Sequence, residues 1–537
     1  MGGQKTSLEK QIVKAGFSIL VAHALFKLAG LIQSVVMGRY LPPGVFDVVY
    51  VFAFERCVYM LFLIGEEVLG PSLLPVFMRE LDTKSERGAW QFANTILTLQ
   101  FCVLVAVATL LCVAPHAVVA FLTQWGPQDS PEKFALAARS VRILAPAVVG
   151  LSLGSTTYVL LNGYKRFFLA AFGDAVWKFC AVGFLVVGTL LSREGAQMLM
   201  WGLVAGSVCK LAVHLFGLRD KLRFVRPQLA WSHPAFRTLC LLAIPLLAGI
   251  LIAKVRDQVN DVYVLSALDE SGLMQANSMG RKLQSTLLYL VPYTLSIAVF
   301  PFFCELVDKQ DHASLGQLVT RFGRMLLSVF VPFAVFVAVA AVPVTSLIFR
   351  GGYFDATAVQ RTAVSLSFYT FVLPAAAIEM LVMQAFFANR RMVSVTLIGV
   401  VFSVISMGVS WFGLKIAGGR ELVVLAFIAG GFTLARTLKS LTLVRMLRAN
   451  ARVFPFRETA AFLARVTLAA GLAALLGWLT LRVRPLAGLT GRVGDLLRLT
   501  AAGTVFGCAY LGGTFVLGIR EIREICGLAF RKIRKQA

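Results

Sequence analysis

Charged side chains stand inside strongly apolar stretches of this sequence. Residues 38–81 read GRYLPPGVFDVVYVFAFERCVYMLFLIGEEVLGPSLLPVFMREL, and KVRDQVND at 254–261 interrupts another apolar run. The basic members of these stretches, with others like them, are Lys27, Arg56, Arg256, Arg281 and Lys282, and the acidic members include Asp47, Glu66 and Asp261. An ionisable group that faces lipid costs at least ~2.5 to 3.5 kcal/mol. These residues therefore predict a polar, protein-lined cavity whose basic groups suit a phosphate or pyrophosphate head group.

Catalytic and metal-binding motifs are missing from the sequence. It holds no Walker A sequence, no HExxH and no GxSxG, and its five His residues are dispersed. The nine Cys show no CxxC pair and no zinc spacing. We therefore expect a transporter and not an enzyme, without a cofactor, that draws on Na⁺ or H⁺ coupling or on the membrane potential.

The elements that position these charges are membrane-spanning helices. Hydrophobic residues make up 58% of the chain, charged residues 15%, and the mean hydropathy is +0.79. Apolar runs of about 20 residues recur throughout, and each can cross a bilayer as a helix. The sequence predicts an all-α polytopic membrane protein with about fourteen spans. They are 16–40, 46–78, 90–122, 134–162, 167–191, 196–218, 238–268, 272–304, 323–349, 357–388, 392–414, 421–444, 459–481 and 497–519.

The net charge of +25 is spread between the apolar runs, which indicates membrane topology and not nucleic-acid binding. Most of the Lys and Arg residues fall on one side of the predicted membrane. Both termini are therefore expected in the cytoplasm.

An internal repeat is visible at one offset, which relates Pro75 to Pro301 and Lys165 to Arg391. It predicts two six-helix lobes, 1–222 and 223–450, arranged as a parallel repeat around a central cavity. Residues 451–537 would add two helices and a basic tail.

Some charges have simpler explanations that stay open. Asp174 and Lys178 are spaced i, i+4 and can form an internal pair. Four arginines lie near span ends, where their side chains can reach the membrane surface: Arg39, Arg139, Arg350 and Arg361.

Several blocks resemble the MurJ/MviN family of lipid II flippases, in the multidrug/oligosaccharidyl-lipid/polysaccharide exporter superfamily. The blocks, in family order, are GEEVLGPSLLPVFMREL (65–81), APAVVGLSLGSTTYVLLNGYKRFFLAAF (145–172), QVNDVYVLSALDESGLMQANSMGRKL (258–283) and FRGGYFDATAVQRTAVSLSFYTF (349–371). The resemblance implies two lobes around a cationic cavity and two further helices that form a groove for a lipid tail. It also implies outward movement of an undecaprenyl-pyrophosphate-linked peptidoglycan precursor by alternating access.

Carried over by position, the family's charges are partly kept and partly changed. Lys27, Asp47 and Lys282 keep the charge sign of the matching family positions. The departures, where a family charge is lost or reversed, are Gln33, Ser34, Arg281, Ser285, Glu379 and Arg391. A family Arg of the second span is replaced by an apolar residue, and Arg56, one turn earlier, can substitute for it. Asp261 matches an acid of the sodium site described for some members.

The resulting site hypothesis assigns substrate binding to Lys27, Arg56, Arg256, Arg281 and Lys282, and gating or coupling to Asp47, Glu66 and Asp261. The expected partners are a lipid-linked anionic glycolipid and membrane lipids in the bacterial cytoplasmic membrane, with cell-wall synthesis proteins left open. Two alternatives remain: an exporter of another glycolipid or small molecule, or a non-transporting cell-wall scaffold.

Overall fold

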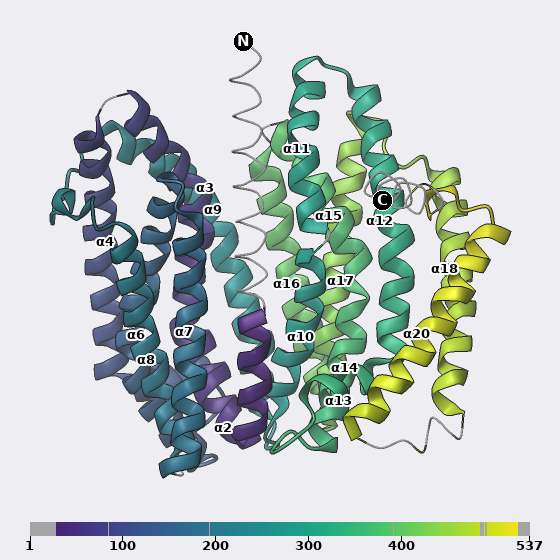
Figure 1. The fold of residues 1–537 in the computed structure, drawn as a ribbon, viewed down its shortest axis with the longest axis horizontal. Helices are drawn as coiled ribbons and strands as arrows, with labels where there is room; N and C mark the ends of the chain where they lie inside the picture. Colours follow the sequence, from purple (N-terminus) through teal and green to yellow (C-terminus); the bar gives the residue numbers. More distant parts are fainter. Residues whose placement is uncertain are drawn as a thin grey trace, which may run out of the picture. The chain divides into compact units, whose positions relative to one another are not determined.

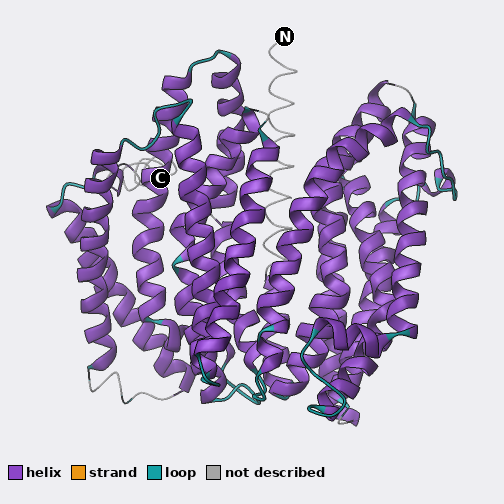
Figure 2. Ribbon diagram, turned by 180° about the vertical axis from the view of Figure 1, so that it is seen from behind, coloured by secondary structure: helices purple, strands orange, loops and turns teal. Residues whose placement is uncertain are grey.

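The computed structural model describes residues 28–83, 85–192, 194–290, 292–389, 391–483, 488, 491–522 and 524. Helices make up nearly all of the regular structure in this part of the chain, and loops join them (Figures 1 and 2). The described residues form two compact units, which are treated separately below. Unit 1 runs to Met274 and includes Gly351–Tyr353, and unit 2 holds Gln275–Arg350 and the chain from Phe354 onward.

Unit 1 is built around α6, which packs against α3, α4, α8 and η1. Residues 28–40 are helical. The further elements of unit 1 are α2 (Pro43–Val45), η1 (Phe46–Tyr59), α3 (Met60–Thr83), α4 (Glu86–Val113), α5 (Pro115–Leu122), α6 (Pro131–Gly163), α7 (Phe167–Val187), η2 (Gly188–Ser192), α8 (Gly195–Gly217), η3 (Leu222–Phe224), α9 (Pro234–Gln258), η4 (Val259–Tyr263) and η5 (Leu265–Ala267).

Small residues let the helices of unit 1 approach closely. A Cβ atom on Gly206 of α8 would lie 2.7 Å from the backbone oxygen of Trp177 on α7. On α6, a Cβ atom at Gly154 would lie 2.7 Å from Cε of Lys210. Small residues at helix contacts are typical of membrane bundles, where close packing replaces the hydrophobic driving force. Here they also make room for a lysine side chain between helices.

Unit 2 contains the later helices of the chain. Its elements are α10 (Leu273–Leu290), of which the first two residues belong to unit 1, α11 (Pro292–Asp308), α12 (His312–Val339), α13 (Ala341–Phe349), α14 (Ala356–Thr370), α15 (Val372–Ala388), α16 (Met392–Ile416), α17 (Glu421–Arg448), α18 (Phe456–Arg482) and α20 (Gly491–Val516). The main apolar core of unit 2 joins α12, α15 and α18 around Phe330, Leu381 and Phe462.

The structure confirms an all-α, multi-pass membrane protein. Among the described residues, eleven helices are long and apolar enough to cross a membrane, or twelve when the pair α14 and α15, bent by 41°, counts as one span. The two remaining predicted spans, 16–40 and 272–304, include residues outside the described part. The count of fourteen therefore stays a prediction.

The division into units differs from the predicted repeat, which places a boundary at 222/223. The helix α9 packs on α3 and belongs to unit 1. Its end is fixed there because Gln258 donates to the backbone oxygen of Leu122 at 3.1 Å, and Ser266 accepts from the backbone of Gln124 at 2.9 Å. Packing groups and sequence repeats need not share boundaries, so the repeat stays a prediction. The described part of 451–537 lies in unit 2, where α18 packs on α12 and α20.

Candidate functional site

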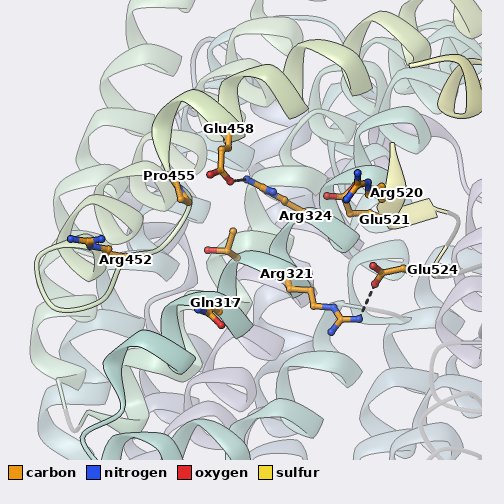
Figure 3. A pocket seen from close by; sticks show the side chains of 10 residues that line it. Gln317, Arg321, Arg324, Arg452, Pro455, Glu458, Arg520, Glu521 and Glu524 are labelled. Carbon is orange, nitrogen blue, oxygen red and sulfur yellow. Dashed lines mark hydrogen bonds and ion pairs between the residues drawn. The ribbon is translucent and has the colours of Figure 1, made fainter. Parts of the chain in front are cut away.

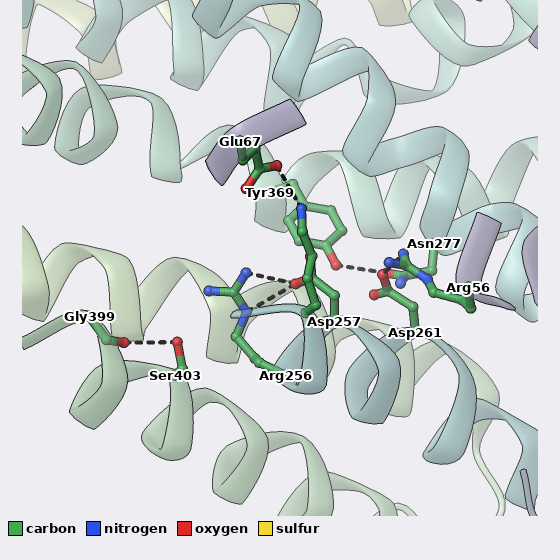
Figure 4. A network of polar contacts seen from close by, with 10 residues as sticks. Arg56, Glu67, Arg256, Asp257, Asp261, Asn277, Tyr369, Gly399 and Ser403 are labelled. Carbon is green, nitrogen blue, oxygen red and sulfur yellow. Dashed lines mark hydrogen bonds and ion pairs between the residues drawn. The ribbon is translucent and has the colours of Figure 1, made fainter. Parts of the chain in front are cut away.

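The sequence-predicted groups of unit 1 meet where two π-helical segments carry opposite charges. Arg56 lies near the end of η1, and Asp261 lies in η4. The guanidinium donates a hydrogen bond to the Asp261 carboxylate and forms an ion pair with it (Figure 4). The Asp261 side chain is 1% exposed and that of Arg56 is 13% exposed. The Nε of Arg56 has no hydrogen-bond partner among the described residues, so the guanidinium retains a donor.

Both members of this pair stand in widened helical turns. The π-helix is rare, occurs mostly as short bulges and is frequent at functional sites. In η1 it runs over fourteen residues, most of them buried aromatic or β-branched side chains. The wider turns change which side chains share a face, so a 3.6-residue period does not predict the direction of Arg56.

Two more ion pairs lie on α9, around the same segment. Arg256 donates to its neighbour Asp257 through Nε at 3.0 Å and through Nη2 at 2.7 Å. Two residues earlier, Lys254 donates to Glu67 of α3 at 2.7 Å (Figure 4). Arg256, a predicted substrate-binding residue, is therefore held by an adjacent carboxylate.

Asp47 ties η1 to the segment that leads out of unit 1. Its buried carboxylate accepts a hydrogen bond from the backbone N–H of Gly272 at 2.6 Å. Gly272 has a φ of +89°, which glycine adopts without strain. Two residues later the chain passes into unit 2. Asp47 thus holds the backbone of unit 1 shortly before its boundary in the sequence, and its predicted gating role stays a prediction.

A buried charged cluster that sequence reasoning missed lies within unit 1. Lys210 of α8 is fully buried and pairs with Asp174 of α7 at 2.5 Å. Its ammonium also lies 3.9 Å from the ring centroid of Phe62 on α3. Glu66, a predicted gating acid one turn after Phe62, is partly buried and interacts electrostatically with Asp174 and Lys210. The sequence predicts only Lys178, on the same helix, as a partner of Asp174 and does not identify Lys210.

His214 completes this cluster one turn after Lys210. Its Nε2 lies 3.0 Å from the backbone oxygen of Ala170, and its Nδ1 lies 2.9 Å from the hydroxyl of Thr157. A carbonyl can only accept, so Nε2 carries a proton. The signal for the cluster was available in the sequence, since GSVCKLAVH places a lone lysine and a histidine on one face of an apolar helix.

The basic groups predicted for unit 2 lie on α10. The guanidinium of Arg281 lies over the ring of Phe432 on α17, 5.2 Å from its centroid. Arg436 of α17 lies 5.9 Å from the same centroid. Lys282 is partly buried, and its backbone oxygen accepts a hydrogen bond from Ser285 at 3.0 Å. A cation over an aromatic face is stabilised by the ring's quadrupole.

Glu379 anchors two further cations that the sequence analysis did not single out. Its side chain on α15 is 4% exposed. The Glu379 carboxylate accepts a hydrogen bond from Arg436 at 2.7 Å and forms an ion pair with Lys439 at 2.8 Å. Asn277 of α10 accepts a hydrogen bond from Tyr369 at 2.9 Å in the same unit (Figure 4). The departure from the family pattern at Glu379 is thus matched by basic residues on α17.

The structure brings together some of the predicted site residues within unit 1, and others belong to unit 2. Arg56, Asp261 and Arg256 are in unit 1, and Arg281 and Lys282 are in unit 2. Lys27 lies outside the described residues. Among the described residues, no group of three or more His, Cys, Asp or Glu side chains could hold a metal ion.

The comparison of folds defines the class of protein. A solved structure of a lipid II flippase MurJ in an inward closed conformation matches with a TM-score of 0.70 at 16% identity, over 93% of this chain and 99% of that one. An inward-facing multidrug resistance MATE family transporter of the MOP superfamily matches with a TM-score of 0.63 at 11% identity, over 80% of this chain and 98% of that one. The fold is therefore one that multi-pass membrane transporters use.

Sequence comparison identifies the family. The family model described as lipid II flippase MurJ matches residues 38–497, so the chain belongs to this family. A probable lipid II flippase MurJ of Rhizobium meliloti (strain 1021) is 22% identical over 390 residues, 72% of this chain and 71% of that protein. The lipid II flippase MurJ of Burkholderia cenocepacia is 21% identical over 380 residues, 70% of this chain and 72% of that protein.

Proposed function

We propose that this protein is a flippase that moves lipid II, a polyprenyl-pyrophosphate-linked peptidoglycan precursor, from the inner to the outer leaflet of the bacterial cytoplasmic membrane by alternating access. The observation that carries the proposal is the family match over residues 38–497, together with relatives named as lipid II flippases. The protein would act as a transporter without catalysing a chemical step, with both termini in the cytoplasm.

The described cations supply the chemistry that a pyrophosphate requires. Guanidinium groups form strong charge-assisted hydrogen bonds to phosphate oxygens. Arg56 retains an unused donor at Nε, and Arg281 is oriented over an aromatic ring. Asp261 balances the charge of Arg56 when no substrate is bound, so an arriving pyrophosphate competes with this carboxylate. Binding of the substrate would thereby loosen the link between η1 and η4.

Gating in this proposal uses the contact of Asp47 with Gly272, because that contact fixes the chain where it leaves unit 1. The energy would come from an ion gradient or the membrane potential. A sodium ion at Asp261 would have to displace the guanidinium of Arg56. The basic groups of both units also favour an anionic substrate over the organic cations expected at an acidic cavity.

The test is rescue of a bacterial strain depleted of its own lipid II flippase. We expect the wild-type chain to restore growth and the Lys282→Ala variant to fail at equal membrane abundance. Lys309→Ala is the matched control, because this lysine is exposed and pairs on the surface with Glu305. Failure of the wild-type chain at normal abundance would refute the proposed function. Rescue by Lys282→Ala would instead remove Lys282 from the binding site.

A further inference from the structure

We propose that a cavity at one end of unit 2 binds the phosphate head group of an anionic membrane phospholipid. The cavity measures about 330 Å³ and lies between α12, the α17–α18 connection, the start of α18 and the segment that carries Arg520, Glu521 and Glu524 (Figure 3). It is separate from the groups assigned above to transport. Its charged lining residues are Arg321, Arg324, Arg452, Glu458, Arg520, Glu521 and Glu524.

Four arginines from three parts of the chain face this cavity. Arg321 and Arg324 are three residues apart, which places them on one face of α12. Arg321 pairs with Glu524 at 2.9 Å, and Arg324 pairs with Glu458 at 3.0 Å (Figure 3). The buried Nε of Arg324 has no hydrogen-bond partner among the described residues. A donor thus remains on a guanidinium whose orientation is already fixed.

The other two arginines carry positive charge that no described carboxylate neutralises. Neither Arg452 nor Arg520 has an ion pair within the described part of the chain, although Glu521 also lines the cavity. Guanidinium forks match the spacing of phosphate oxygens, and several such donors around one cavity favour a phosphate over a single carboxylate.

The backbone around the cavity is fixed in position. The hydroxyl of Thr320 on α12 accepts a hydrogen bond from the backbone of Phe454 at 2.8 Å, which anchors the connection that carries Arg452. At the other side, α20 ends at Val516, and Gly518, two residues later, has a φ of +69°; the backbone N–H of Ile519 donates to the backbone oxygen of Thr514 at 2.9 Å. This left-handed helix end turns the chain and places Arg520 at the cavity. The arginines are therefore presented by ordered turns.

The surroundings favour a lipid over a soluble phosphate. The cavity lies where α17 ends and α18 begins, so it lies at a helix end, where lipid head groups are expected. From there α18 exposes Leu468, Leu472 and Leu475, one face of a helix that crosses the membrane. Acyl chains can lie along this apolar face while the phosphate occupies the cavity. Basic pockets between membrane helices are a known setting for anionic lipid head groups.

The experiment measures lipid binding to the purified full-length chain in detergent by native mass spectrometry. The probes are phosphatidylglycerol, phosphatidylcholine, farnesyl pyrophosphate and inorganic phosphate. We expect phosphatidylglycerol to bind in preference to phosphatidylcholine. The double variant R452A/R520A should weaken phosphatidylglycerol binding about tenfold or more, since each charge-assisted hydrogen bond that is lost contributes substantially to the binding free energy. The ion pairs of Arg321 and Arg324 stay intact in this variant, so the fold is spared.

The matched control is Arg457→Ala, because Arg457 is exposed on the first turn of α18 and does not line the cavity. This variant should bind phosphatidylglycerol within about twofold of wild type. Glu521→Gln should bind it more tightly, because a lining carboxylate repels phosphate. Equal losses in Arg457→Ala and the double variant, or no loss in either, would overturn the site. Tighter binding of farnesyl pyrophosphate or competition by inorganic phosphate alone would overturn the assignment to a bilayer phospholipid.

Discussion

Separating the structural and functional roles of Arg56 and Asp261 is the most informative perturbation of the candidate site. Arg56→Gln removes the ion pair between Arg56 and the Asp261 carboxylate, whose side chain is 1% exposed. Removing one partner of a buried ion pair typically destabilises a protein by about 3 to 5 kcal/mol. Asp261→Asn removes the carboxylate that pairs with the guanidinium of Arg56. Because the Arg56 side chain is 13% exposed, we expect its stability loss to be near the lower end of this range, about 3 kcal/mol. The double variant carries neither charge, and we expect it to be more stable than Arg56→Gln.

The measurement is a double-mutant cycle of unfolding free energies in mixed micelles, combined with rescue of the flippase-depleted strain. The expected coupling energy is about 2 kcal/mol, within the range for residues in one ion-pair network. Additive effects, with a coupling below about 0.5 kcal/mol, would refute the view that this pair stabilises the contact between η1 and η4. Full rescue by a stable double variant would refute substrate binding by Arg56.

Two further perturbations test other charge pairs. Glu379→Gln should lower stability by about 2 to 4 kcal/mol in the same unfolding assay, because Arg436 and Lys439 then lose their shared buried carboxylate, and a change below about 1 kcal/mol would contradict this. Outside the membrane, hydrogen bonds from Arg166 lower the pKa of Asp220 from its ordinary 3.8 to about 2. Because the pKa is lowered in the folded state, ionised Asp220 contributes to folding stability above about pH 4, and this contribution is lost as the pH falls toward 2. The melting temperatures of the wild type and of Asp220→Asn should therefore converge over that pH range. A constant difference in melting temperature between the two proteins across this pH range would exclude a contribution of Asp220 ionisation to stability.

The helices themselves could be predicted from the sequence because apolar length alone specifies them. The predicted spans 134–162 and 196–218 differ from α6 (Pro131–Gly163) and α8 (Gly195–Gly217) by only a few residues at each end. Proline at the first positions of α6 fixes where it begins. The π-helical turns of η1 could not be predicted, because their cause is tertiary packing and their apolar pattern is continuous.

The candidate site was only partly predictable, because its charges pair across helices. Spacing within one segment suggested Lys178 as a partner of Asp174, whereas Lys210 pairs with it from another helix. In unit 2, Glu379 has its partners on α17, about sixty residues away. Local periodicity identifies which face of a helix is polar, and only the packing of helices decides which opposite charge it meets.

The buried ion pairs of each unit keep its charges neutralised, which matters for a protein that moves within a membrane. Carboxylates within the same unit neutralise Arg56, Lys210 and Arg436. Burying an unpaired charge is far more expensive than burying a hydrogen-bonded pair, so a unit that carries its own counter-charges can move relative to the membrane without exposing a bare ion to lipid. Selective binding of a pyrophosphate then requires cations with spare donors, and not simply a high density of positive charge. Under the proposed function Arg56, whose buried Nε has no hydrogen-bond partner among the described residues, is the candidate for this role. Lys210, enclosed beside Asp174 and Phe62, is better suited to holding α3, α7 and α8 together.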